Sequence, residues 1–226
     1  MHAALQTAES MEPLAKLPQS AGFRIVAPDQ RGHGRSANPG RTLSIPMLVD
    51  DIIELMDHLA IASPVLIGYS LGGIVALELA TRGVPSGLVT LAARAVPIAE
   101  ERTAFDPADI QRRSPLWARQ LSEKHEETPW RELALELGRV LSAWPGIGPG
   151  ALASIQSPTL VVQGDRDQMV PVAQARLLAD SIPGAQLLVV PHVGHPELLY
   201  RQEVVQAVGA FLAQLHGSSR GQSPTK

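Results

Sequence analysis

Short apolar runs alternate with amphipathic stretches along most of this 226-residue chain. The runs are continuous and rich in Val, Ile and Leu, as in strands that are covered on both faces of a sheet. They lie at Phe23–Ala27, Val65–Gly68, Leu88–Leu91, Thr159–Val162 and Gln186–Val190. Because these runs alternate with helical patterns, the sequence predicts an α/β fold with a mostly parallel sheet wrapped by helices.

The stretches between the runs have the periodicity of helices. From Leu48 to Leu59, Leu and Ile recur at helical spacing and acidic residues occupy other positions. Further helices are expected over Ile74–Arg82, Val172–Ser181 and Glu197–Leu215. Residues 217–226 are polar and rich in Gly and Ser, which predicts a disordered tail.

One long stretch, from about Ile98 to Ile155, has helical patterns (108–124 and 130–141) but no strand pattern, and Pro145–Gly150 closes it as a loop. An insertion between two strands predicts a small helical cap over the strand ends, where α/β folds bind ligands. The expected division is therefore core (1–97), cap (98–153), core (154–216) and tail (217–226). Trp117 and Trp130 of the cap are candidate substrate-binding residues, with plain helix packing as the alternative for either one.

Composition narrows the function classes. The net charge is −3 and no basic cluster is interleaved with aromatics, so no nucleic-acid partner is expected. The chain has no Cys, which excludes disulfides and a cysteine nucleophile. No apolar run reaches the roughly 18 residues that span a bilayer, and the first residues lack a signal-peptide pattern. We therefore expect a cytoplasmic protein with no membrane partner, and the oligomeric state has no sequence signal.

The most specific motif is Gly68-Tyr69-Ser70-Leu71-Gly72, a G-x-S-x-G sequence between an apolar run and a helical stretch. At such a strand-to-helix turn the backbone bends sharply and exposes the serine hydroxyl, and the two glycines let strand and helix approach. A glycine-rich turn with a capping serine is the alternative. The motif predicts Ser70 as a nucleophile.

A serine nucleophile needs a base and a group that orients the base. Asp165 and Asp167 follow the fourth apolar run, and His192 and His195 follow the fifth. The carboxyl ends of parallel strands meet at one edge of the sheet, so these residues and Ser70 are expected there together. By composition alone either aspartate could be the acid, whereas His192 is expected to be a loop or partly buried histidine.

Other polar clusters lack the spacing of a cofactor site. His125-Glu126-Glu127 has no second histidine and is interpreted as a solvated helix end. His58 and His216 are expected on the surface. No metal-ligand spacing and no phosphate-binding glycine loop is present, so we expect neither a metal nor a cofactor.

Taken together, these motifs resemble the serine-nucleophile members of the α/β-hydrolase family, from His2 to about Leu215. The family's nucleophile motif falls on Gly68–Gly72, its G-x-x-D-x-x-V-P pattern on Gly164–Pro171, and its last Gly-His on Gly194-His195. Ala27–Ser36 matches the turn after the family's fourth strand, which is structural, so Asp29 and His33 receive no catalytic role.

This resemblance implies a chemistry and assigns its residues. Ser70 is the nucleophile, Asp167 rather than Asp165 the acid, and His195 the base, while the backbone N–H groups of Leu71 and Ala4 bind the oxyanion. The implied reaction is acyl transfer on a small ester, thioester, lactone or amide, with carbon–carbon bond hydrolysis of diketones as a neighbouring possibility.

The sequence departs from the family pattern at its start. Family members usually have two or three strands before a His-Gly-x turn, but here His2-Ala3-Ala4 is preceded by Met1 alone. The strand that leads into this turn is expected between the strands predicted at 23–27 and 65–68. We therefore expect either a fragment of a longer protein, unstable or inactive without its N-terminal strands, or an unusual sheet.

Overall fold

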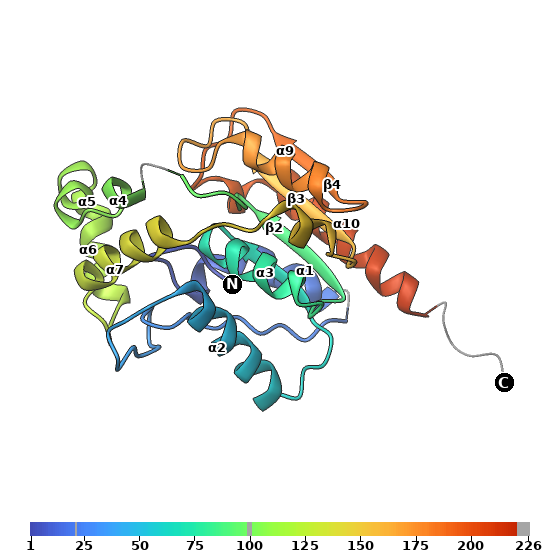
Figure 1. Ribbon diagram of the computed structural model, residues 1–226, viewed down its shortest axis with the longest axis horizontal. Coiled ribbons are helices and arrows are strands. Elements are labelled where there is room, and N and C mark those ends of the chain that lie inside the picture. The colour runs from blue at the N-terminus through green and yellow to red at the C-terminus, as the bar shows by residue number, and fades with distance from the viewer. Residues whose placement is uncertain (21, 99–100, 221–226) are drawn as a thin grey trace.

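A parallel four-stranded sheet forms the centre of the computed structural model, which describes residues 1–20, 22–98 and 101–220 (Figure 1). The strands are β1 (Val65–Tyr69), β2 (Gly87–Leu91), β3 (Thr159–Gly164) and β4 (Gln186–Val190), and their spatial order follows their sequence order. Leu66 pairs with Leu88, and Leu160 pairs with Gln186. Each of these strands was predicted to within two residues at either end.

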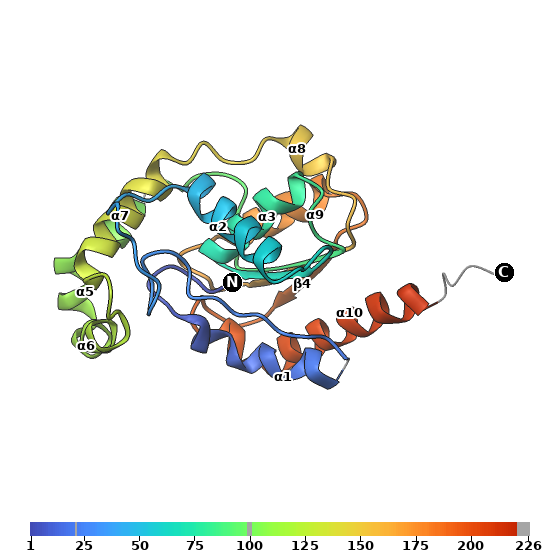
Figure 2. The ribbon, with the colours of Figure 1, turned by 90° about the horizontal axis from the view of Figure 1, so that it is seen from below.

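Helices cover both faces of the sheet, as the continuous apolar strands predicted (Figure 2). On one face lie α2 (Ile45–His58), α3 (Leu71–Thr81), α8 (Pro149–Ala153) and α9 (Val172–Ser181). On the other lie α1 (Glu12–Ser20) and α10 (Gln202–Arg220), which pack against each other. The short 3-10 helices η1 (Ala8–Met11) and η2 (Leu198–Tyr200) precede α1 and α10.

Four further helices from the range predicted as a cap (98–153) lie together at one end of the molecule, whereas α8 of the same range packs against α3 and α9 (Figure 1). They are α4 (Glu101–Ala104), α5 (Pro107–Arg113), α6 (Pro115–Lys124) and α7 (Trp130–Ala143). The helix expected over 108–124 is divided at Ser114, because Pro115 cannot donate the backbone hydrogen bond that would continue α5. Asp106 starts α5 by accepting from the N–H groups of Ala108 (2.8 Å) and Asp109 (3.0 Å).

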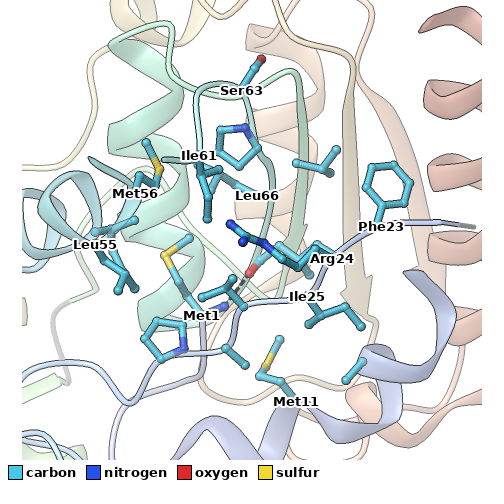
Figure 3. Close-up of a pocket in the computed structure, with 18 of the residues that line it drawn as sticks. Met1, Met11, Phe23, Arg24, Ile25, Leu55, Met56, Ile61, Ser63 and Leu66 are labelled. Atoms are coloured by element: carbon cyan, nitrogen blue, oxygen red, sulfur yellow. Dashed lines mark hydrogen bonds between the residues drawn. The ribbon is translucent and has the colours of Figure 1, made fainter. Parts of the chain in front are cut away.

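The strand predicted over Phe23–Ala27 is wrong. These residues form no regular element, and an apolar cavity of about 430 Å³ separates them from β1 (Figure 3). Met1 pairs with the end of β1, since its nitrogen donates to the Ile67 carbonyl (2.7 Å) and its carbonyl accepts from Tyr69 N (3.1 Å). A β ladder needs a neighbouring backbone about 5 Å away. Among the described strands β1 pairs only with β2, and residues 23–27 form no ladder with it.

Two smaller expectations also need correction. Helix α10 continues through Arg220, so residues 217–220 are helical, and the rest of the expected tail lies outside the described residues. The loop expected over Pro145–Gly150 ends at Gly148, because Pro149 opens α8.

Among the helices that the structure describes, none has the length and apolar character needed to cross a membrane.

Candidate active site

Ser70 lies in the sharp turn between β1 and α3, with backbone angles φ 53° and ψ −113°. This conformation is strained for a residue other than glycine, and surrounding contacts must hold it. One such contact is the hydrogen bond from Ser70 N to the Leu91 carbonyl of β2 (2.9 Å). A Cβ at Gly68 would collide with the Gly72 carbonyl, and a Cβ at Gly72 with the carbonyls of Met1 and His2. Both glycines are therefore required by close backbone packing, and the turn leaves Ser70 partly exposed.

Asp167 and His195, predicted from different strands, meet at the same edge of the sheet. Asp167 follows β3, His195 follows β4, and His195 Nδ1 lies 2.6 Å from Asp167 Oδ2. The Asp167 side chain is fully buried and that of His195 is 8% exposed. A carboxylate at Nδ1 holds the proton on that nitrogen, which leaves Nε2 as the ring's free base.

The Asp167 carboxylate is held by more groups than the sequence indicated. Its Oδ1 accepts from the N–H groups of Met169 and Val170 (2.8 Å each), and its Oδ2 also accepts from Gln163 Nε2 (3.0 Å). Gln163 is fully buried in β3 and donates to the Val170 carbonyl as well (2.9 Å). Sequence reasoning missed Gln163, which directly follows the apolar run predicted over Thr159–Val162.

Tyr69 connects the nucleophile turn to the histidine. Its hydroxyl donates to the His195 carbonyl (2.7 Å), and its ring stacks on the imidazole with centroids 5.1 Å apart. Burial raises the pKa of Tyr69 above its usual value, so the hydroxyl remains a neutral donor. The residue directly before Ser70 therefore positions the backbone of His195, a role that the motif did not reveal.

The N-terminal turn carries the second predicted oxyanion donor. The Gln6 N–H donates to the Ala3 carbonyl (3.2 Å), which closes a turn around Ala4 and Leu5. Gly72 N donates to the His2 carbonyl (3.1 Å), which joins this turn to the start of α3. Within the described parts of the chain, the N–H groups of Ala4 and Leu71 have no hydrogen-bond partner. A role of the two N–H groups in binding an oxyanion stays a prediction.

Comparison with known proteins identifies the family of this chain. A family model described as "Alpha/beta hydrolase family" matches residues 2–207. The chain belongs to the alpha/beta hydrolase family.

Relatives within this hydrolase family differ in the reactions that their names describe. A pimeloyl-[acyl-carrier protein] methyl ester esterase of Stenotrophomonas maltophilia is 29% identical over 88% of this chain and 86% of that protein. A 2-hydroxymuconate semialdehyde hydrolase of Pseudomonas sp. is also 29% identical, over 84% of this chain and 77% of that protein. The solved structure of Est816, described as an N-acyl homoserine lactone degrading enzyme, has a TM-score of 0.76 and 27% identity, and the match covers 93% of this chain and 91% of that one.

The remaining candidates of this hydrolase have different surroundings. The exposed Asp165 accepts from Val193 N at 3.4 Å, and His192 is an exposed loop residue with φ 60°. Trp130 is 2% exposed and donates from its ring nitrogen to Ser122 Oγ (2.9 Å), so it packs within the cap. Trp117 is 38% exposed on α6. A role of either tryptophan in substrate selection stays a prediction.

The interpretation of His125 as a solvated helix end is wrong, because this side chain is 5% exposed. Its Nδ1 accepts from Gly34 N (3.1 Å), so residues near position 34 bury it against the core. His58 is exposed as expected, and His216 is half-buried beside Phe23. Among the described residues, no group of three or more His, Asp or Glu side chains is arranged to hold a metal ion.

Proposed function

We propose that this chain is a serine hydrolase that cleaves a small ester or a related acyl substrate through an acyl-enzyme. The observation that supports this most directly is the buried Asp167–His195 pair at the sheet edge where the Ser70 turn also lies, with Tyr69 linking the two. Family membership supports hydrolysis in general. The serine at the turn supports acyl transfer as the kind of hydrolysis.

In the proposed first step, Ser70 Oγ attacks the substrate carbonyl carbon while His195 Nε2 takes the hydroxyl proton. The carbonyl π electrons move onto oxygen, and the N–H groups of Leu71 and Ala4 bind the resulting oxyanion. Leu71 begins α3, so the positive end of the helix dipole adds to this stabilisation. Asp167 keeps the imidazole oriented and stabilises its protonated form.

The tetrahedral intermediate then collapses. The bond to the leaving group breaks, His195 gives its proton to the departing oxygen, and the acyl group stays on Ser70. A water molecule next gives a proton to His195 and attacks the acyl carbon. Breakdown of this second intermediate releases the carboxylic acid and returns the proton to Ser70.

The proposal defines the substrate class less narrowly than it defines the residue roles. Relatives are named for an ester, a semialdehyde and a lactone, and the same groups could serve a lactone or a carbon–carbon bond next to a carbonyl. We favour a small ester because a methyl ester esterase is among the relatives that match most of this chain. The cap helices α5–α7, with Trp117 and Trp130, are proposed to select the acyl group.

Replacement of the nucleophile tests the proposal. Ser70→Ala should abolish both hydrolysis of p-nitrophenyl acetate and covalent labelling by a fluorophosphonate. Ser154→Ala is the matched control, because Ser154 is exposed and its hydroxyl bonds only locally, to the Ala151 carbonyl (2.7 Å). Persistent labelling of a folded Ser70→Ala variant would refute the assignment of Ser70.

A further inference from the structure

The rings of three buried histidines contact one another in a row, the histidine stack, next to the predicted oxyanion turn. The rings of His2 and His33 meet edge to face with centroids 4.9 Å apart, and those of His33 and His125 with centroids 5.8 Å apart. His2 and His33 are fully buried, and His125 is 5% exposed. The stack runs from the N-terminal turn to the end of cap helix α6, two segments more than 110 residues apart in sequence.

His2 holds the turn that presents Ala4. Its Nε2 accepts from Gln30 N (2.9 Å), so its proton is on Nδ1 and is donated to the Ala3 carbonyl (2.8 Å). Gln30 Nε2 donates to the His2 carbonyl (2.8 Å). The position of the Ala4 N–H therefore depends on how the segment around Gln30 is held.

The cap holds that same segment from the other side. The backbone of Gly34 pairs with the end of α6 twice, because its N–H donates to His125 Nδ1 (3.1 Å) and its carbonyl accepts from Glu126 N (3.2 Å). The carbonyl of Leu5, which lies in the turn around Ala4, raises the pKa of His125. His125 thus contacts the segment around Gly34 directly and is linked to the turn through the rings of His33 and His2.

The contact requires a neutral imidazole. Nδ1 of His125 accepts a hydrogen bond, so a proton on that nitrogen would oppose the Gly34 N–H. Burial lowers the pKa of His125, which favours the neutral form. The charged groups that face the ring are Asp29, from the same segment as Gly34, and Lys124 of α6, and its other titratable neighbours are His33 and His2.

We propose that His125 is a positioning residue that couples the cap to the oxyanion turn: by accepting from Gly34 N it fixes the histidine stack that holds the Ala4 N–H in place. This inference rests on the proposed acyl transfer and adds to it a cap residue that acts on catalysis without contacting substrate. The cap then influences the chemical step as well as the choice of acyl group.

A pair of substrates separates this role from a purely structural one. p-Nitrophenyl acetate develops charge on oxygen, whereas p-nitrophenyl thionoacetate develops it on sulfur, a weak hydrogen-bond acceptor that gains less from the oxyanion donors. His125→Leu should lower kcat for the oxygen ester about tenfold, less than the 10²–10³ of losing one donor, because the donor is displaced rather than removed. KM should change little, and the thiono ester should lose much less. His125→Asn, whose side-chain oxygen can accept from Gly34 N, should restore the oxygen-ester rate to within about threefold.

Controls make every outcome decisive. His58→Leu makes the same change at an exposed position of α2 and should leave both rates unchanged. A folded His125→Leu variant with unchanged rates, or with equal losses on both substrates, overturns the inference. If Ser70→Ala still hydrolyses the ester, the proposed function fails instead.

If His125→Leu does not fold, the pH profile provides the test. The preference of the wild type for the oxygen ester should fall in acid as His125 is protonated, while His125→Asn keeps its preference. Protonation of His195 slows both substrates and cancels from this ratio. If the preference for the oxygen ester falls equally in acid in the wild type and in His125→Asn, the inference is overturned.

Discussion

The sharpest test of the candidate site is Asp167→Asn, because the structure assigns a donor to each lone-pair position of the carboxylate. Oδ2 accepts from His195 Nδ1 (2.6 Å) and Gln163 Nε2 (3.0 Å), and Oδ1 accepts from the N–H groups of Met169 and Val170 (2.8 Å each). A carboxamide has one acceptor oxygen and one NH₂ donor group. Whichever way the amide turns, its NH₂ faces two other donors.

The cost of this mismatch follows from the contacts. Two buried donors left without acceptors destabilise the fold by about 2–6 kcal/mol, at roughly 1–3 kcal/mol each. If the amide NH₂ faces His195, the ring can relieve one clash by moving its proton to Nε2, but it then loses the free lone pair that takes the Ser70 proton. The equivalent change in a serine triad lowers kcat about 10⁴-fold, or about 5.5 kcal/mol in the barrier.

The assay compares Asp167→Asn with Asp165→Asn, two identical substitutions two residues apart. We expect Asp167→Asn to lose activity on p-nitrophenyl acetate by about 10⁴-fold and to unfold at lower urea concentration. Asp165 is exposed and accepts a single long bond from Val193 N (3.4 Å), so its variant should differ from the wild type by less than about 0.5 kcal/mol and keep its kcat. A kcat within tenfold of the wild type for Asp167→Asn, or a larger loss for Asp165→Asn, would show that the carboxylate has been assigned wrongly.

Two further predictions concern buried groups near the site. Burial lowers the pKa of His33 from 6.5 to about 4. Between these values the unfolded chain binds more protons than the folded chain, so the free energy of unfolding decreases as the pH is lowered through that window. In urea titrations, His33 should account for a decrease of about 2–3 kcal/mol in the free energy of unfolding from pH 7 to pH 4.5. An equally large decrease in His33→Gln would contradict this. Tyr69→Phe removes the shorter of the two hydrogen bonds to the His195 carbonyl and leaves the one from Leu198 N (3.4 Å). The free energy of unfolding should therefore fall by about 1–2 kcal/mol, and kcat several-fold at nearly constant KM. Unchanged stability and kcat in that variant would mean that the 2.7 Å hydrogen bond contributes nothing.

Much of the candidate site could be predicted because its signals are local. G-x-S-x-G specifies a turn through steric contacts among neighbouring residues, and the Gly68 and Gly72 packing explains why both positions are glycine. Asp167 and His195 follow predicted strands, so a parallel sheet alone brings them to one edge. The choice of Asp167 over Asp165 came from resemblance, and the 2.6 Å contact to His195 gives it a physical basis.

Groups that support the site were beyond sequence reasoning, because their roles depend on distant partners. Gln163 was one polar residue in a strand, and Tyr69 was one variable position of a motif. His125 has the polar neighbours of an exposed helix end, yet it is buried because the segment around Gly34, some 90 residues earlier, packs over it. Neither the composition nor the residue spacing indicates such a contact.

The sequence by itself determined the elements whose pattern is sufficient to form them: four apolar strands, the helices between them and the turn at Ser70. Tertiary structure decided which apolar run could join the sheet. Residues 23–27 have the same strand pattern as β1, but a strand exists only where a second backbone accepts and donates its hydrogen bonds, and a cavity lies at that position instead. Hydrophobic periodicity is a property of neighbouring residues, whereas strand pairing and the burial of polar side chains depend on residues that only the folded chain brings together.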